Sequence, residues 1–571
     1  MRQLPILLLL VCVLVACSGI DGTPDTATPR PVSTPPQATP TPLPAGTTTG
    51  AQVRARGRLR VGVRYDLQPF GFVDERGHVD GFDVALGREF ARRWLGDAEA
   101  VEFRQVRTDT AVEHIQAGDI DLAIAALPHT QDGEAGVDFT LPYFRDGQAL
   151  LVRAVDAASI EGPGSLENRL VGVSRWNGAN VALQSAVPFT LSVQLYDRFD
   201  YAVAAMGRGE VQVVADLRHR LFWGAAMLPG SVIVGQYSWT PLAMAYPQND
   251  AFFADLVNLT FQEMVADGTY ANLYARWFAQ EDPPVVERWP GSERPLLTDA
   301  PLFAAAPNTL GGIRVRGRLV VALAPDRSPF SYVDDSGTLA GYDVTLVRLL
   351  AERWLGDPSA VDFVPASMDA AMEMLRTGQV DMLVGGVAHT RAAEMQIDFS
   401  TTTYVAGESL MVIAGTPVTG VGDLVGQQVA VVTGTDSGDV LLAAAQREGV
   451  ALTVIPQPSL ASAMTLLQEG QVAAVAGDRA LMLGPAYATP GVGVLPLRLT
   501  EVPLAVGLPP GDSAFRDLVN LTLQAMARDG QMTGLYQTWF EDSPPVQDEW
   551  PGAPYRLLRI ELSSAAEGDL E

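Results

Sequence analysis

The residues of this chain that could recognise a small molecule recur as one short motif in each half. The motif runs from Asp66 to Phe70 in the first half and from Asp326 to Phe330 in the second, with Pro before each Phe. An Asp carboxylate can accept hydrogen bonds from a cationic group, and a Phe ring can form an apolar wall. Such an Asp can also complete the turn after a strand, and such a Phe can belong to a core. The motif therefore leaves ligand binding and structural support open.

Reactive side chains are scarce. Cys12 lies inside the apolar N-terminal run and Cys17 ends it, so the mature chain has no free thiol for a disulfide, a thiolate metal site or a nucleophile. His129 and His389 occupy matching places in separate copies, and two such residues do not make a metal site, which needs three or four converging ligands. We therefore expect no catalytic residue, no metal and no cofactor.

The N-terminus predicts export. Arg2 precedes the apolar run Leu4 to Ala16, which is too short to cross a bilayer and is typical of a signal-peptide core. The run ends in Leu-Val-Ala-Cys, which resembles the bacterial lipobox; this implies that residues 1–17 form a lipoprotein signal with acylated Cys17. The alternative is an ordinary signal peptide cut near Ala16. No later segment is apolar enough for a transmembrane helix.

The next segment and the charge limit the partners. Residues 18–56 begin with a tract of Thr, Pro, Gly and Ala that cannot form a core, so we expect a disordered, extended tether. The formal net charge of −27 repels nucleic acid and anionic membranes. We therefore expect no nucleic-acid partner, and membrane contact through the lipid alone.

The rest of the chain is a duplication. Residues 57–84 match residues 317–344, and residues 255–268 match residues 517–530. A spacing of about 260 residues is too long for a solenoid repeat and indicates a duplicated domain.

Strands and helices alternate in each copy. Short apolar runs at 59–63 and 319–323 predict buried strands, and the helical periodicity of 82–95 and 342–355 predicts the helices that follow. Asp83 and Asp343 stand at the helix starts, where we expect them to act as caps. Further strands are expected at 120–125 and 380–384. The alternation predicts parallel sheets with helices on both faces and ligands at the carboxyl ends of the strands.

Six blocks of residues occur in the same order in both copies. They include the Asp-to-Phe motif, Gly-Phe-Asp-Val at 81–84 or Gly-Tyr-Asp-Val at 341–344, and the closing segments ADGTYANLYARWF (266–278) and RDGQMTGLYQTWF (528–540). Together they resemble the bacterial extracellular solute-binding proteins of the polar amino-acid type, family 3.

This resemblance implies an architecture. It implies an α/β fold with two tandem periplasmic-binding-protein-like (type II) modules, each with two α/β lobes and a hinge around a cleft. It places module 1 at 57–295, a linker at 296–312, module 2 at 313–556 and a C-terminal tail at 557–571.

The resemblance also implies roles for single residues. The family grips an amino acid with an Arg for the α-carboxylate, N–H donors at a Gly-Thr turn, an Asp for the α-ammonium and an aromatic wall. The ammonium partner falls on Asp478, and in the first copy Asp216 is the nearest candidate. The full set of expected ligand-binding residues is Asp66, Phe70, Ala126, Thr130, Gly178 and Asp216 in module 1, and Asp326, Phe330, Gly386, Ala388, Thr390, Arg391, Gly434, Thr435 and Asp478 in module 2.

The chain departs from the family at the carboxylate Arg. That position holds Gly133 in the first copy and Ala393 in the second. Arg391 lies two positions earlier and could replace it if the turn is rearranged. Pro128 also removes an N–H donor that Ala388 keeps. We therefore expect module 2 to bind a small zwitterion or cationic amine, and module 1 to be degenerate or to bind something without a carboxylate.

The implied function is extracytoplasmic capture of a small polar solute, an amino acid or related amine, by cleft closure. The expected partner is an ABC-type permease, and the expected location is the outer face of the cytoplasmic membrane or the cell surface. Two alternatives on the same fold are a ligand-sensing receptor subunit with a membrane partner and a dehydratase-like enzyme. We expect no enzyme, because catalysis would need a positioned acid or base that no residue cluster indicates.

Overall fold

The computed structural model describes residues 48–175, 179–278, 282–291, 293–300, 307–334, 336–540, 543–547 and 550. The expected signal segment, Cys17, most of the expected tether, Gly178 and the expected tail lie outside these residues. None of the described helices has both the length and the apolar character needed to cross a bilayer.

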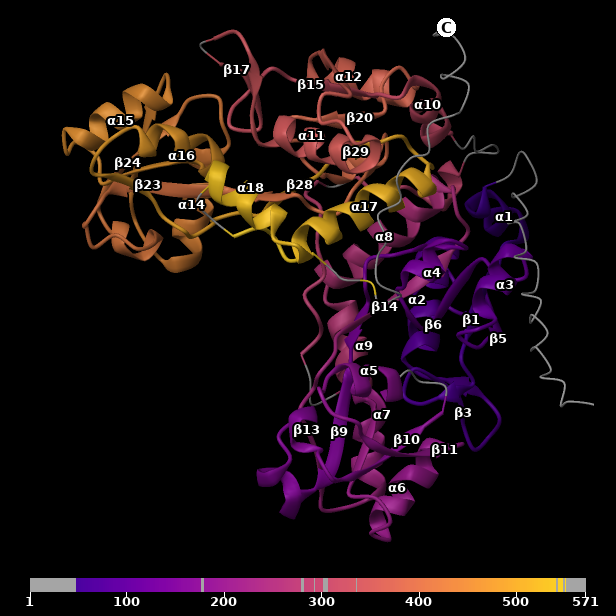
Figure 1. The fold of residues 1–571 in the computed structure, drawn as a ribbon. Helices are drawn as coiled ribbons and strands as arrows, with labels where there is room; N and C mark the ends of the chain where they lie inside the picture. The colour runs from indigo at the N-terminus through magenta and orange to yellow at the C-terminus, as the bar shows by residue number, and fades with distance from the viewer. Residues whose placement is uncertain are drawn as a thin grey trace, which may run out of the picture. The chain divides into compact units, whose positions relative to one another are not determined.

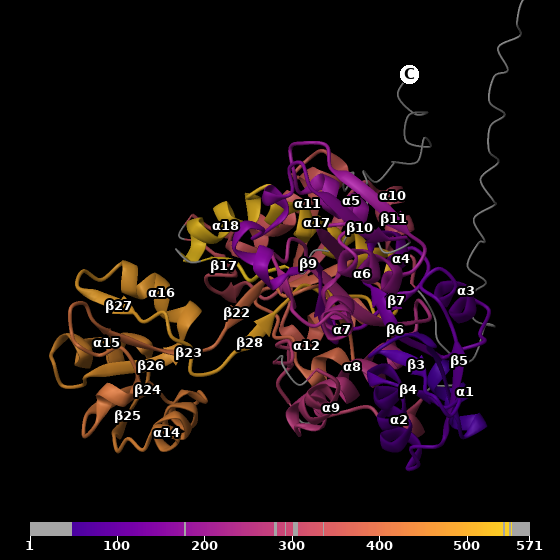
Figure 2. The same cartoon turned by 90° about the horizontal axis from the view of Figure 1, so that it is seen from below.

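Figures 1 and 2 label many of the helices and strands of both modules. The first lobe of module 1 contains α1 (Thr49–Arg56), β1 (Leu59–Val63), β2 (Asp66–Leu67), β3 (Gly71–Val73), β4 (Val79–Asp80), α2 (Phe82–Leu95), β5 (Val101–Gln105), α3 (Ala111–Gln116), β6 (Leu122–Pro128), α4 (Gln131–Glu134), β7 (Asp138–Phe139), β8 (Phe144–Asp146), β14 (Thr240–Tyr246), α8 (Ala251–Ala266) and α9 (Thr269–Trp277). Its second lobe contains β9 (Gln148–Arg153), β10 (Leu170–Ser174), α5 (Ala179–Ser185), β11 (Ser192–Tyr196), α6 (Phe199–Gly207), β12 (Val213–Leu217), α7 (Arg218–Met227) and β13 (Ser231–Val234).

Module 2 repeats this series. Its first lobe contains α10 (Thr309–Arg316), β15 (Leu319–Leu323), β16 (Asp326–Arg327), β17 (Ser331–Val333), β18 (Leu339–Ala340), α11 (Tyr342–Leu355), β19 (Val361–Pro365), α12 (Met368–Arg376), β20 (Met382–Val384), α13 (Arg391–Glu394), β21 (Asp398–Phe399), β22 (Tyr404–Ala406), β28 (Val502–Leu504), β29 (Gly507–Leu508), α17 (Ser513–Arg528) and α18 (Gln531–Phe540). Its second lobe contains β23 (Glu408–Ile413), β24 (Gln428–Val432), α14 (Ser437–Glu448), β25 (Thr453–Gln457), α15 (Leu460–Gln468), β26 (Ala474–Asp478), α16 (Arg479–Tyr487) and β27 (Val492–Val494).

The predicted architecture of two tandem α/β modules is confirmed. The first lobes have the matching strand orders β5-β1-β6-β14-β7 and β19-β15-β20-β29-β21. The second lobes match as β11-β10-β12-β9-β13 and β25-β24-β26-β23-β27. In lobe 2 of module 2, α14 packs on one face of the sheet, and α15 and α16 pack on the other (Figures 1 and 2).

The expected first strand and following helix of each copy are confirmed at their predicted bounds. The strands expected at 120–125 and 380–384 begin two residues later, at Leu122 and Met382. The prediction of parallel sheets was wrong in part, because the sheets are mixed. Strand β14 runs antiparallel to β6, and β9 runs antiparallel to β12. The chain crosses between the lobes twice, and the strand that enters after each crossing runs against its neighbours.

Each module starts earlier than expected, with a short helix. Residues 49–56, which we assigned to the disordered tether, form α1, and Thr49 N–H donates to Asp250 Oδ2 at 2.7 Å. The helix α10 repeats this contact, with Thr309 N–H on Asp512 Oδ2 at 2.9 Å. The buried side chain of Val53 shows why the tether ends here, since burying an apolar side chain in the lobe stabilises the helix.

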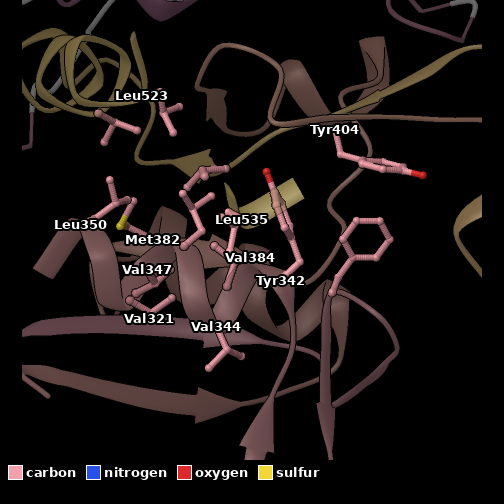
Figure 3. Packing of buried hydrophobic residues seen from close by; sticks show 14 of the residues in the cluster. Val321, Tyr342, Val344, Val347, Leu350, Met382, Val384, Tyr404, Leu523 and Leu535 are labelled. Atoms are coloured by element: carbon pink, nitrogen blue, oxygen red, sulfur yellow. The ribbon is translucent and has the colours of Figure 1, made fainter. Parts of the chain in front are cut away.

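The largest core of module 2 lies between α11, the central strands and the C-terminal helices (Figure 3). Val344, Val347 and Leu350 on one side of α11 are buried against Val321 and Met382 of the sheet. The first module has the same cluster around α2. These cores hold lobe 1 rigid, so the loops at the carboxyl ends of its strands have fixed starting points.

Candidate functional site

In module 2, a buried carboxylate holds the loop that follows β20. Asp343 Oδ2 accepts the N–H groups of Gly385 and Gly386 at 2.8 and 2.7 Å. Burial raises the pKa of Asp343 to about 6, while these hydrogen bonds oppose the rise. The expectation that Asp343 caps its own helix was wrong, because the N-cap of α11 is Gly341 and no side chain bonds there.

Module 1 holds the equivalent segment, which here belongs to β6, through a tyrosine. The Tyr143 hydroxyl donates to Asp83 Oδ1 at 2.8 Å and accepts from the N–H of Ala126 at 3.0 Å. Burial raises the pKa of Asp83 to about 7. Asp83 is likewise no helix cap, because the N-cap of α2 is Gly81 without a side-chain bond. Ala126, an expected ligand residue, therefore lies in an irregular stretch of β6 that the core positions, with a φ of +47°.

The Phe330 ring packs directly on this loop. A Cβ added at Gly386 would come within 2.8 Å of the ring, and the φ of Gly386 is +67°, so only glycine fits here without strain. The ring also meets Tyr404 edge to face, at 5.3 Å between centroids. Phe330 is 6 % exposed, so it belongs to the core and forms the floor beneath the loop.

The N–H of Ala388 points away from the neighbouring strand. Ala388 forms a bridge with Leu504 in which the bonds are made by the residues on either side, His389 N–H to Pro503 O and Ala505 N–H to Val387 O. This is the non-hydrogen-bonded type of antiparallel pair, so the polar groups of Ala388 face the other way. The neighbouring Thr390 caps α13 by accepting the Ala393 N–H at 3.2 Å.

Lobe 2 of module 2 places two carboxylates side by side. Asp478 ends β26, caps α16 by accepting the Leu481 N–H at 3.1 Å, and lies directly opposite Glu408 of β23. Burial raises the pKa of Asp478, and hydrogen bonds from its helix and the charge of Arg327 oppose the rise. Arg327 belongs to lobe 1, so opposite charges approach each other from the two lobes.

The expected Gly-Thr turn also lies in this lobe. Gly434 has a φ of +82°, and the Thr435 hydroxyl donates to Val432 O at 2.8 Å. The turn leads into the N-terminus of α14. On lobe 1, Asp326 is exposed at the start of β16, and the Arg327 Nη2 donates to Gly386 O at 3.3 Å.

Strand register shows that Asp216 is not the counterpart of Asp478. Asp478 pairs with Glu408, the first residue after the crossing glycine Gly407. The same place in module 1 is taken by Leu217, which pairs with Gln148. Asp216 lies one residue earlier and is fully buried, where it accepts the Ser174 hydroxyl and the Leu217 N–H. The alignment from sequence was therefore shifted by one residue, and the structure gives Asp216 an internal role.

Phe70 of module 1 is covered by a residue from lobe 2. The His219 ring lies edge to face on Phe70, at 4.6 Å between centroids, and its Nδ1 contacts Asp146 Oδ2. Both Phe70 and His219 are buried. Module 2 has Ala480 and Ala406 where module 1 has His219 and Asp146. The wall residue of module 1 therefore contacts the protein's own side chain.

The remaining expected residues of module 1 have internal partners. Asp66 is exposed and accepts two hydrogen bonds from Arg64, at 2.7 and 3.1 Å, which keep its pKa below the usual value. Thr130 caps α4 by accepting the Gly133 N–H at 3.1 Å. In the part of the chain that the structure describes, no three His, Cys, Asp or Glu side chains are placed to hold a metal.

Sequence comparison decides the family. Residues 59–280 and 319–542 each match the bacterial extracellular solute-binding proteins, family 3. The chain belongs to this family. The resemblance that the six blocks indicate is thereby confirmed, and both family domains coincide with the modules of the fold.

Individual relatives of this family 3 protein are binding proteins. The ABC transporter glutamine-binding protein GlnH of Bacillus subtilis is 26% identical over 239 residues, which is 42% of this chain and 86% of the relative. The glutamate/aspartate import solute-binding protein of Salmonella typhimurium is 24% identical over 251 residues, covering 43% and 83%. Among solved structures, an ancestral arginine-binding protein bound to glutamine shares 32% identity over 39% of this chain and 99% of its own, with a TM-score of 0.34.

In this solute-binding protein, Arg391 faces the other module instead of its own cleft. The backbone N–H of Arg391 donates to Pro290 O at 3.0 Å, and the guanidinium Nη1 lies 3.7 Å from Glu263 Oε1. The indole of Trp289 stacks on His389, with 3.9 Å between ring centroids. The placement of Arg391 gives no support to its expected role as an anion partner, because the Arg391 guanidinium is already paired with Glu263.

The contact between the modules is reciprocal. Trp550, at the end of module 2, stacks on His129 of module 1 at 4.1 Å. Each histidine bonds through Nε2 to a buried glutamate, His129 to Glu134 and His389 to Glu394. A cavity of about 470 Å³ lies between these groups and is lined by both modules.

One arginine pairs with an acidic residue of each module at this contact. Arg516 of α17 lies 3.0 Å from Asp138 Oδ2 and 3.5 Å from Asp398 Oδ2. Burial raises the pKa of Asp398 to about 7 and that of Glu394 to about 8, although Arg516 opposes both shifts. Arg516 therefore lies close to several buried carboxyl groups.

Four residues that matter here were missed by the sequence reasoning: Arg327, Glu408, His219 and Arg516. Each differs in type from its counterpart in the other module, which is Leu67, Gln148, Ala480 and Ala254 respectively. A residue-by-residue comparison of the two copies would have found them, whereas comparison with the family pattern did not.

Proposed function

We propose that this protein captures a small polar solute of the amino-acid type in the cleft of module 2 and delivers it to an ABC-type importer. The observation that carries the proposal is the approach of Arg327 from lobe 1 and Asp478 from lobe 2. A guanidinium suits an α-carboxylate and an Asp suits an α-ammonium, so Arg327 replaces the family arginine that Ala393 lacks. The outward-facing N–H of Ala388 and the turn at Gly434 add donors for the carboxylate.

Module 1 lacks both charges. Leu217 stands at the position of Asp478, and Leu67 at that of Arg327. His219 also covers the wall residue Phe70. We therefore assign the amino-acid site to module 2 and give module 1 a supporting role through the contact between modules.

The relatives' names support delivery to an importer, since one is an ABC transporter component and another an import protein. Capture works by closure, because contacts from both lobes stabilise the closed form. Export and anchoring through lipid on Cys17, at the outer face of the cytoplasmic membrane or the cell surface, belong to this proposal and rest on the leader pattern.

Calorimetry of the full chain against a panel of amino acids and amines tests the proposal. We expect one solute per chain, and a loss of about 10- to 100-fold in affinity for Asp478→Asn, because a charge-assisted bond is removed. The matched variant Leu217→Ala in module 1 should leave affinity unchanged. Two equivalent binding events per chain, binding that ignores Asp478, or no binding of any panel member would contradict it.

A further inference from the structure

We infer that Glu408 selects a solute with a second cationic group, so the amino acid or amine taken by module 2 is a basic one. The inference rests on the function proposed above and adds the class of solute. It concerns the two carboxylates that lobe 2 presents together, Glu408 and Asp478.

The strand pairing fixes these side chains next to each other. Glu408 is the first residue of β23 and lies directly opposite Asp478, the last residue of β26. Directly opposite residues of an antiparallel pair extend to the same face, with Cβ atoms about 4.5–5.5 Å apart. Two like charges in this arrangement repel each other unless a cation lies between or above them.

The described residues around Glu408 supply no such cation. Its charged neighbours are Asp478 and Asp436, and its one side-chain partner is the hydroxyl of Ser437. Within the described residues, Glu408 Oε2 is buried and has no hydrogen-bond partner. A buried carboxylate oxygen without a donor is unfavourable, so a ligand that donates a hydrogen bond to Glu408 Oε2 would remove this cost.

The arginines near Glu408 do not act as the cation that its carboxylate lacks. Arg327 approaches Asp478 from lobe 1, and the charge of Arg479 acts on Tyr404, where it opposes the rise in the pKa of the hydroxyl that burial causes. Neither acts on the carboxyl of Glu408, whose pKa is raised by burial and by its acidic neighbours. With Arg327 engaged by the solute carboxylate, an α-ammonium and a side-chain ammonium or guanidinium would match the two acids.

Module 1 provides the natural comparison. The same pair of positions holds Gln148 and Leu217, so the duplication kept the geometry and changed two charges. A neutral amide opposite an apolar residue brings no negative charge to attract a cation. The pair of acidic side chains is therefore particular to module 2 and does not follow from the fold that both modules share.

The test measures affinities of the full chain for L-arginine, L-lysine, L-glutamine and L-glutamate by calorimetry. We expect the wild type to bind the two basic amino acids at least about 10-fold more tightly than glutamine. The variant Glu408→Gln, which copies Gln148, should lose about 10- to 100-fold for the basic amino acids and less than about 3-fold for glutamine. The matched variant Gln148→Glu should change neither preference nor stoichiometry.

The outcomes separate the two proposals. Preference for glutamine or glutamate in the wild type, or an equal loss for all four amino acids in Glu408→Gln, would overturn the role of Glu408. If binding depends on Asp478 but not on Glu408, the proposed function stands and this inference fails. If none of the four probes binds while another amino acid or amine of the panel does, the proposed function stands and this inference fails. Circular dichroism of each variant verifies that the fold is kept.

Discussion

At the scale of single residues, Asp343 sets the shape of the loop on lobe 1. One buried oxygen accepts two consecutive N–H groups, and both donors are glycines with positive φ, +112° at Gly385 and +67° at Gly386. Such φ values favour glycine, and the contact with Phe330 leaves no room for a side chain. The carboxylate therefore fixes where the following residue Ala388 presents its N–H.

We predict that Asp343→Ala lowers the free energy of unfolding by about 1–3 kcal/mol, because it leaves two buried N–H donors without an acceptor. Solute affinity should fall as well, since the loop loses its anchor. Asp343→Asn keeps an acceptor oxygen and should lose less. Urea denaturation and calorimetry measure both effects. The control is Asp369→Ala, at an exposed position in α12, for which a change under about 0.5 kcal/mol is expected. An equal loss in the control would show that the loop bonds are unimportant.

At the scale of elements, the two modules differ in how their lobes meet. In module 1, the start of α7 is tied to the end of β8 by His219 and Asp146, and Phe70 packs on the same histidine. In module 2 the corresponding residues are Ala480 and Ala406, which cannot make that bond. The same strands and helices therefore carry a His–Asp tie between the lobes in module 1 that these positions of module 2 lack.

We predict that solute shortens the distance between lobes in module 2 and leaves that in module 1 unchanged. Spin labels at the exposed residues Val333 and Leu442 report on module 2, and labels at Val73 and Tyr201 report on module 1. Pulsed electron resonance measures both distances in chains whose native cysteines are replaced by serine. In His219→Ala, the distance distribution of module 1 should broaden, because its tie is removed. A solute-induced change in module 1 of the wild type would argue against a tied hinge.

At the scale of the whole described chain, buried titratable groups gather at the contact between the modules. Glu394 is bonded to His389 and lies near Arg516 and Asp398 of its own module, and it faces Asp255 of module 1 across the contact. Burial raises the pKa of Glu394 to about 8 and lowers that of His389 to about 3, so the bonded pair keeps one proton on the glutamate up to about pH 8. Unfolded, the two separate groups bind one proton between about pH 4.5 and 6.5 and none above.

The sign of the pH dependence follows from this count. Above about pH 6.5 the folded pair binds more protons than the unfolded pair, so stability falls as pH rises through about 8. Burial raises the pKa of Asp398 from about 4 to about 7, so its contribution to stability also decreases as the pH rises from about 4 to about 7. We predict that the urea midpoint decreases between pH 6 and 8.5, and that Glu394→Gln makes the decrease smaller because the amide does not ionise. A midpoint that rises with pH, or a variant with the wild-type slope, would contradict this account.

The sequence by itself determined the duplication, the family and the main secondary structure. Repeated blocks do not depend on tertiary context, and the apolar runs at 59–63 and 319–323 became strands at those bounds because their residues are buried on both faces. The helices at 82–95 and 342–355 followed from their periodicity.

Only the tertiary structure decided where the expected site residues lie and what they contact. Strand register placed Leu217 opposite Gln148 and moved Asp216 inside, and a shift of one residue turns a side chain to the other face. Arg391 packs against module 1, where it pairs with Glu263. Arg327 of lobe 1 lies near Asp478 of lobe 2 because the chain crosses between the lobes. These outcomes depend on contacts between residues far apart in the chain, which local patterns of residue type do not encode.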